Sequence, residues 1–167
     1  VSFLTGLSPE HHGVVDNAIA EADLSDTIAT RLQAVGWRTG IVGKLGNKMV
    51  DLPARPPGWD TYQVLQKHSD FGRDQSKVLA NRAADFLRAC VWDDVPCFLL
   101  VTPPSPHGPL PGPVECVGPW PTQPAGTSMS SDEWERRMSS LCGLNRLLDK
   151  VYRFLPPGGT MVFTNDN

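Results

Sequence analysis

The sequence predicts an α/β fold with a largely parallel sheet that is covered by helices. Three segments carry apolar residues at helical spacing, and each is followed by a short apolar run that is typical of a buried strand. Repeated helix-then-strand units are the pattern of α/β proteins, because parallel strands need long connections. The length of 167 residues corresponds to about one domain.

The first unit lies between residues 24 and 44. Leu24-Ser25-Asp26 offers an N-cap, and Gly36 can end the helix. Between them Ile28, Leu32 and Val35 recur at helical spacing. The run Thr39-Gly-Ile-Val-Gly-Lys44 then predicts a buried strand.

Two further units follow the same order. Residues 76–90 predict a helix and residues 97–101 the strand after it; residues 131–155 and 160–164 repeat the pattern. Residues 48–74 and 102–130 lack periodicity, and the second segment holds most of the prolines, so both are predicted to be loops. Loops of this length usually carry function.

Composition excludes two classes of partner. Fifteen Lys and Arg against 18 Asp and Glu give a net charge of −3, which leaves no excess positive charge for a nucleic-acid backbone. Apolar runs such as residues 97–101 are far shorter than the roughly 20 residues of a membrane span. No signal peptide is visible, and both ends look cut, so we expect a sheet that is incomplete at both ends.

The four cysteines contain no C-x-x-C pair, which argues against a zinc ribbon or a thioredoxin-like redox site. Cys90 and Cys97 bracket Asp93-Asp94 and could close a small disulfide loop. Cys97 also opens an apolar strand, where a buried free thiol is equally ordinary. Both alternatives stay open, and Cys116 and Cys142 are not assigned a pairing.

Polar residues follow the predicted strands at Lys44, at His107 and at Asp166-Asn167. Ligands of open α/β sheets gather beyond the carboxyl ends of the strands, so these segments could meet in one site. A lysine balances the charge of an anionic ester, a histidine exchanges a proton, and carboxylate and amide oxygens bind a hard cation. The alternative is a solvated lysine, a loop histidine bonded to backbone and a polar turn.

Four motifs, in this order, resemble the sulfatase family across nearly the whole chain. The first would directly follow the nucleophile motif C-x-P-S-R, whose Arg would precede Val1. The motifs are Phe3-Leu-Thr-Gly6 with Ser8-Pro-Glu-His-His-Gly-Val14, Ile41-Val-Gly-Lys44, Pro103-Pro-Ser-Pro-His-Gly-Pro109, and Phe163-Thr-Asn-Asp-Asn167.

Three further segments are most similar to the N-acetylglucosamine-6-sulfatase branch: Gly43-Lys-Leu-Gly-Asn47, Pro56-Pro-Gly-Trp-Asp60 and Val78-Leu-Ala-Asn-Arg-Ala83. The chain also departs from family patterns. It has no histidine two places after Lys44, and Asn145-Arg146 replaces the acidic pair usual in the last helix.

The resemblance implies an alkaline-phosphatase-like fold in which residues 1–167 form the central part of a sulfatase catalytic domain. It implies hydrolysis of a sulfate ester by formylglycine, made from a cysteine upstream of this chain, beside a bound Ca²⁺. Lys44 would contact the sulfate, and His107 would hydrogen-bond the sulfate or assist the leaving oxygen. Asp166 and Asn167 would be calcium ligands.

The same resemblance implies a sulfated carbohydrate or an aryl sulfate as substrate, and a place in the secretory pathway, the lysosome, the extracellular space or a periplasm. It leaves the oligomeric state open. A phosphoryl hydrolase of the same superfamily is the first alternative, with zinc in place of calcium. A catalytically dead fragment or glycan-binding remnant is the second. Trp59 lies where a sugar ring could stack, although core packing suits it better.

Overall fold

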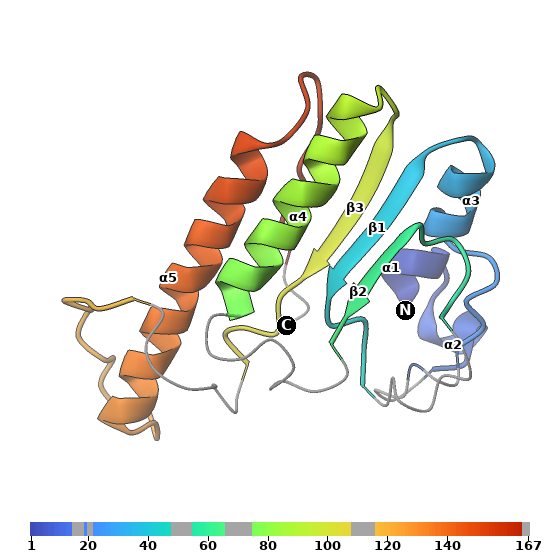
Figure 1. The fold of residues 1–167 in the computed structure, drawn as a ribbon. Coiled ribbons are helices and arrows are strands. Elements are labelled where there is room, and N and C mark those ends of the chain that lie inside the picture. Colours follow the sequence, from blue (N-terminus) through green and yellow to red (C-terminus); the bar gives the residue numbers. More distant parts are fainter. Residues whose placement is uncertain (15–18, 20–21, 48–54, 66–74, 108–115, 165–167) are drawn as a thin grey trace.

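The computed structural model describes residues 1–14, 19, 22–47, 55–65, 75–107 and 116–164 as a sheet between two groups of helices (Figure 1). α4 and α5 lie side by side on one face of the sheet, and α1, α2 and α3 lie beyond the other face. The strands are β1 (Arg38–Gly43), β2 (Thr61–Val64) and β3 (Cys97–Thr102). The helices are α1 (Ser2–Thr5), α2 (Pro9–His12), α3 (Ile28–Ala34), α4 (Gln75–Trp92) and α5 (Ser131–Arg153).

The three strands are parallel, in the order β2-β1-β3. Gly43 at the end of β1 is in register with Val64 at the end of β2 and with Thr102 at the end of β3. All three carboxyl ends therefore lie at one edge of the sheet (Figure 1). A parallel sheet covered on both faces agrees with the predicted fold class.

Successive side chains of β1 point to opposite faces of the sheet and so contribute to two separate cores. Val42 joins the core under α4 and α5, whereas its neighbour Ile41 joins the core on the α3 side; both are fully buried. Gly40 faces α4, where a Cβ would lie 2.6 Å from the Phe86 ring. The glycine allows the helix to approach the sheet closely.

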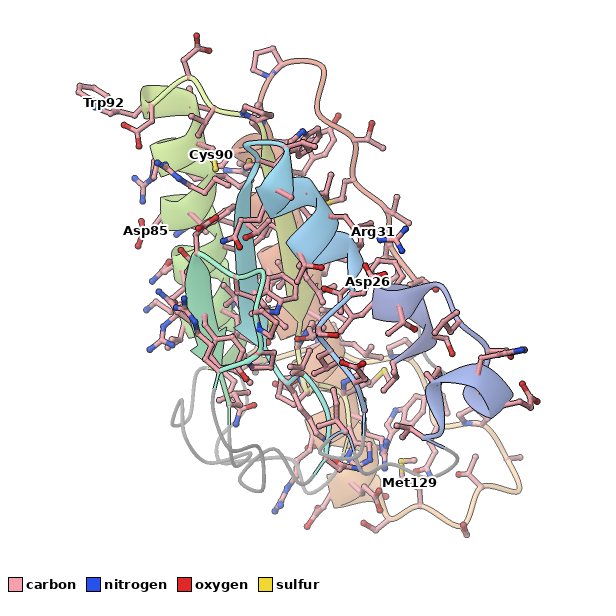
Figure 2. All side chains as sticks on the ribbon, turned by 90° about the vertical axis from the view of Figure 1, so that its right-hand side faces the viewer. Asp26, Arg31, Asp85, Cys90, Trp92 and Met129 are labelled. Atoms are coloured by element: carbon pink, nitrogen blue, oxygen red, sulfur yellow. A yellow bond between two sulfur atoms is a disulfide. The ribbon has the colours of Figure 1, made fainter. Side chains whose placement is uncertain are left out.

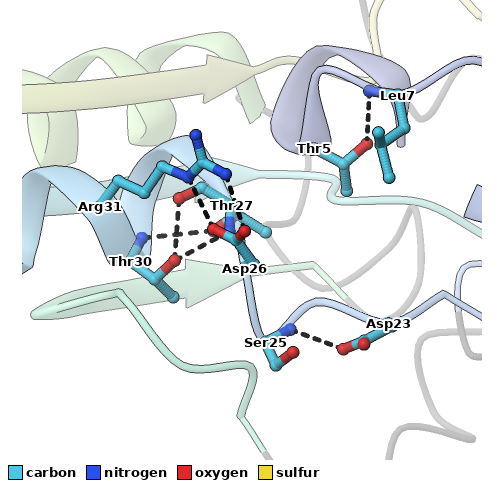
Figure 3. Close-up of polar contacts among 8 residues, drawn as sticks. All are labelled: Thr5, Leu7, Asp23, Ser25, Asp26, Thr27, Thr30 and Arg31. Carbon is cyan, nitrogen blue, oxygen red and sulfur yellow. Dashed lines mark hydrogen bonds and ion pairs between the residues drawn. The ribbon is translucent and has the colours of Figure 1, made fainter.

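α3 begins at a capping box (Figure 3). The Thr30 backbone N–H donates to Thr27 Oγ1 at 3.3 Å, and the Thr27 backbone N–H donates to Thr30 Oγ1 at 2.8 Å. The prediction of an N-cap within Leu24-Ser25-Asp26 was wrong by at least one residue, because Asp26 instead pairs with Arg31. Thr27 is therefore the N-cap of α3, and it is also buried, with 3% of its surface exposed.

α4 and α5 confirm the second and third predicted helices with small shifts at their ends. α4 extends two residues past Cys90 to Trp92, whose ring projects away from the molecule (Figure 2). α5 ends at Arg153 rather than residue 155, and its N-cap Ser130 accepts a hydrogen bond from the Glu133 N–H. Among the described residues, no helix combines the length and apolarity needed to cross a membrane.

β2 lies inside the segment 48–74 that was predicted to be a loop. It begins just after Pro56-Pro-Gly-Trp-Asp60, whose carboxylate joins the two strands: Asp60 Oδ2 accepts from the Thr39 backbone N–H at 2.8 Å. Trp59 is 2% exposed and stacks near Phe98, with ring centroids 6.1 Å apart. Trp59 is therefore a core residue rather than a sugar platform.

The strand predicted at residues 160–164 was wrong. These residues belong to no helix or strand, and Val162 and Phe163 are 78% and 62% exposed. An apolar run becomes a strand only where a neighbouring strand satisfies its backbone, and β1, β2 and β3 pair with one another only, among the described strands.

The disulfide links Cys116 with Cys142, while Cys90 and Cys97 are free thiols. Of the two alternatives for Cys90 and Cys97, the free thiols are therefore correct. Burial, together with the neighbouring Cys97 thiol, raises the pKa of Cys90 to about 12. Cys90 stays protonated at neutral pH and behaves as a small apolar core residue.

Leu79→Ala tests the core between α4 and the sheet. Leu79 is fully buried beside Val42, so its truncation should lower the free energy of unfolding by about 2–5 kcal/mol in urea titrations. Leu141→Ala makes the same change on α5 at a side chain that is 40% exposed, and it should cost clearly less. Equal losses for the two variants would contradict this description of the core.

Candidate functional site at the carboxyl edge of the sheet

Lys44 directly follows β1, between the ends of both neighbouring strands. Its backbone N–H donates to the Thr102 carbonyl of β3 at 2.8 Å, while the Gly43 carbonyl accepts from the Leu65 N–H at 2.7 Å on the β2 side. These bonds continue the sheet past β1, so the position of the Lys44 backbone is set by both neighbours. Its side chain is partly exposed.

Gly43, the residue before Lys44, fits this position only because it has no side chain. Its φ of +124° is a conformation that other residues rarely adopt, and a Cβ would overlap the Thr102 carbonyl. That carbonyl is the acceptor of the Lys44 N–H. The close approach of β1 to β3 and the placement of Lys44 therefore depend on the same glycine.

His107 lies five residues beyond the end of β3, in a proline-rich turn. Its backbone N–H donates to the Pro104 carbonyl at 2.9 Å, and Pro104 and Ser105 are buried whereas His107 is exposed. From α5, Arg137 Nη1 donates to the Pro106 carbonyl at 3.3 Å. The turn is thus held by its own backbone, by burial and by a helix distant in sequence.

The structure brings two of the four predicted site residues to one edge of the sheet. Lys44 and His107 follow the neighbouring strands β1 and β3, and the Lys44–Thr102 hydrogen bond joins those strand ends. Asp166 and Asn167, the predicted calcium ligands, lie outside the described residues. Among the described residues, no three or more His, Cys, Asp or Glu side chains are grouped to hold a metal ion.

Polar residues that sequence reasoning missed also lie near these strand ends. Thr102 Oγ1 and Gln63 Oε1 are buried atoms without a hydrogen-bond partner, as is Nε2 of Gln75, the first residue of α4. Buried polar atoms are normally paired, so such atoms beside a strand end are candidates for ligand contact. The sequence signal that could have found them is a polar residue, Thr102 or Gln63, within a strand that is otherwise largely apolar or aromatic.

His11 and His12 lie on α2, and their rings bond to other residues of the N-terminal segment 1–14. His12 Nδ1 accepts from the Val14 backbone N–H at 3.1 Å, which leaves Nε2 as the donor to Ser2 Oγ at 3.0 Å. His11 Nδ1 is instead 2.9 Å from Ser8 Oγ. The two rings bind different hydroxyl groups, as expected of residues that hold a turn rather than share a metal ion.

Comparison with solved structures shows which known fold this architecture resembles. A protein of the alkaline phosphatase superfamily from Vibrio parahaemolyticus matches with a TM-score of 0.51 and 19% sequence identity, over 91% of this chain and 38% of that chain. The chain shares the alkaline phosphatase superfamily fold. The predicted fold class is confirmed, and at this identity the match speaks for the fold alone.

Comparison of sequences adds a relative with a named activity. A Caenorhabditis elegans protein named "Putative extracellular sulfatase Sulf-1 homolog" is 28% identical over 138 residues, which cover 65% of this chain and 19% of the relative. The chain spans a small part of the relative it matches. No protein-family model matches the sequence. The similarity to a sulfatase homolog is therefore partial, and it does not identify a branch of the family.

Gly43→Ala tests whether this glycine sets the end of β1. The new Cβ would meet the Thr102 carbonyl, so the variant should lose at least 2 kcal/mol of stability relative to wild type, from left-handed strain of about 1–2 kcal/mol plus the clash. Gly126→Ala carries similar strain, with φ +83° but nothing within 4 Å of the new Cβ. If Gly126→Ala lost as much stability in thermal unfolding, the close approach at Gly43 would not be the cause.

Proposed function

We propose that residues 1–167 are the central part of a sulfatase catalytic domain, which hydrolyses sulfate esters of sugars or aryl alcohols. The C. elegans sulfatase homolog and the order of the four sequence motifs support this proposal. The observation that carries it is the Lys44–Thr102 hydrogen bond, because it joins the strand ends that lead to Lys44 and His107. Edges of this kind are where α/β folds bind ligands.

In this proposal Lys44 binds the sulfate group of the substrate. Its backbone is fixed by hydrogen bonds on both sides, so the ammonium group starts from a rigid base and can be directed at a developing negative charge. His107 donates a hydrogen bond to the sulfate or gives a proton to the leaving oxygen. Its turn is restrained by Pro103, Pro104 and Pro106, so little conformational entropy is lost when substrate binds.

Two groups outside the described residues complete the proposed site. Asp166 and Asn167 would hold Ca²⁺ through a carboxylate and an amide oxygen, which are donors that suit this hard cation. When bound, calcium supplies positive charge beside the sulfate, and a formylglycine made from the cysteine of an upstream C-x-P-S-R motif supplies the nucleophile. Neither Asp166 nor Asn167 alone makes a calcium site, which takes six to eight oxygens.

The finer assignments belong to the same proposal. The N-acetylglucosamine-6-sulfatase branch, and with it glycosaminoglycan degradation, is supported by Gly43-Lys-Leu-Gly-Asn47 and Val78-Leu-Ala-Asn-Arg-Ala83. Secretion is supported by the word "extracellular" in the name of the C. elegans relative and by the Cys116–Cys142 disulfide, which forms most readily in oxidising compartments.

A phosphoryl hydrolase is the second candidate, because the alkaline phosphatase superfamily fold is compatible with it as well. Metal analysis of the purified full-length protein separates the two, because calcium accompanies the sulfatase proposal and zinc the phosphatase alternative. A glycan-binding remnant would bind sulfated sugars without turnover of either ester.

His107→Ala should lower kcat for an aryl sulfate by about 10²–10⁴-fold in the full-length enzyme, the range for loss of a general acid. The control is His11→Ala on α2, whose ring contacts the Ser8 hydroxyl in the same short segment, and it should leave kcat unchanged. Steady-state kinetics on both variants decide the matter. Unchanged turnover in His107→Ala would remove the residue from the mechanism.

Activity should require the segment upstream of Val1. Residues 1–167 alone, expressed with a formylglycine-generating enzyme, should hydrolyse neither an aryl sulfate nor a 6-sulfated glucosamine, because none of the four cysteines lies in a C-x-P-x-R sequence. A longer protein that carries C-x-P-S-R upstream should turn over the sulfate ester, and its Cys→Ala variant at that motif should not. Turnover by residues 1–167 alone would refute the assignment of the nucleophile.

A further inference from the structure

The turn that carries His107 is attached to the N-terminal half of α5 as well as to the sheet. Arg137 reaches the Pro106 carbonyl, and Ser139 Oγ accepts a hydrogen bond from the Cys116 backbone N–H at 3.0 Å. Cys142 forms the disulfide with Cys116. Three attachments within six residues of one helix thus hold the chain on both sides of residues 108–115.

Arg137 is itself held in place before it reaches the turn. Its Nη2 and Nε donate to Glu133 Oε1 at 2.8 and 3.2 Å, one helical turn earlier, so the guanidinium plane is fixed by two bonds. The remaining Nη1 donates to the Pro106 carbonyl, and Pro106 directly precedes His107. An exposed i,i+4 ion pair alone contributes little to stability, so what distinguishes Arg137 is this third bond.

α5 is a rigid support for this contact. Its residues Leu147 and Val151 belong to the core formed with α4, and Ser139 is 1% exposed. α5 therefore connects the core, which it contacts through Leu147 and Val151, with the peptide before His107, which it contacts through Arg137. Small displacements of a catalytic group cost large factors in rate, so a support of this kind has a consequence for the reaction.

We propose that Arg137 is a positioning residue for His107: it fixes the Pro106 carbonyl and thereby the direction from which the imidazole meets the substrate. The proposal rests on the proposed function, because it assumes that His107 acts on the substrate. Arg137 itself touches neither substrate nor reacting atoms in this role.

The experiment compares Arg137→Ala, Arg137→Lys and Arg136→Ala in the full-length enzyme with an aryl sulfate. Arg136 is the adjacent arginine on α5 and is exposed, so its variant makes the same change of charge and helix propensity without the Pro106 contact. Arg137→Ala should lower kcat by about 10–100-fold with KM nearly unchanged. Arg137→Lys, which keeps one donor and the charge, should recover part of kcat, and Arg136→Ala should match wild type.

Two readouts separate positioning from a general loss of structure. The double variant Arg137→Ala/His107→Ala should be no slower than His107→Ala alone, because a positioning residue has nothing left to position. Hydrogen exchange at the His107 amide, which donates to Pro104, should be faster in Arg137→Ala than in Arg136→Ala.

The outcomes distinguish this inference from the proposed function. Equal kinetics for Arg137→Ala and Arg136→Ala, or additive losses in the double variant, would overturn the positioning role while leaving the sulfatase proposal intact. If His107→Ala kept full activity, His107 would have no role in catalysis, and the positioning role of Arg137 would be refuted with it. If the full-length protein turned over no sulfate ester, hydrogen exchange alone would decide whether Arg137 orders the turn, and equal exchange in both arginine variants would refute it.

Discussion

The parallel pairing of β1 with both of its neighbours is the constraint on which the rest of the structure depends. Thr39, Ile41 and Val42 are fully buried in this central strand, and each face of it supports a separate core. At the end of β1 the approach to β3 is so close that only glycine fits at position 43. Stability and placement of the strand-end residues are therefore set by the same backbone pairing, because a shift of β1 would move Lys44 relative to the β3 end.

The segment Pro56-Pro-Gly-Trp-Asp60 shows how a motif that suggests function can serve the fold. Trp59 fills the core on the α3 side, and the Asp60 carboxylate accepts from the Thr39 N–H of β1 and from Gln33 Nε2 at the end of α3. A Cβ on Gly58 would meet the backbone of Thr30. Gly58, Trp59 and Asp60 therefore each make a contact within the packing of α3, β1 and the start of β2, so the spacing of these three residues follows from packing.

The sequence alone predicted the fold class, two strands and three helices, because their apolar periodicity is a local property of the chain. It failed where partners distant in sequence decide the outcome. β2 is only four residues long and half-buried, so its alternation is weak, and residues 160–164 have strand-like composition without a paired neighbour. The Cys116–Cys142 disulfide and the Arg137–Pro106 contact depend on how α5 lies against the proline-rich segment, which spacing does not reveal. For the candidate site, spacing located Lys44 and His107 after the strands, while the unpaired Thr102 and Gln63 atoms became visible only in the structure.

The fold by itself does not choose between sulfate and phosphate esters, because either ester would present a tetrahedral anion to the proposed site. Charge offers a physical distinction. A phosphate monoester carries nearly two negative charges at neutral pH, whereas a sulfate monoester carries one. Among the described strand ends the positive charge comes from Lys44, while Arg137 beside the His107 turn is already paired with Glu133. Under the proposed sulfatase function, Lys44 and one calcium ion would face the single charge of a sulfate ester, whereas the phosphatase alternative would bring two zinc ions to the higher charge of a phosphate. The positive charge at this edge is therefore the physical property that separates the proposed sulfatase from the phosphatase alternative.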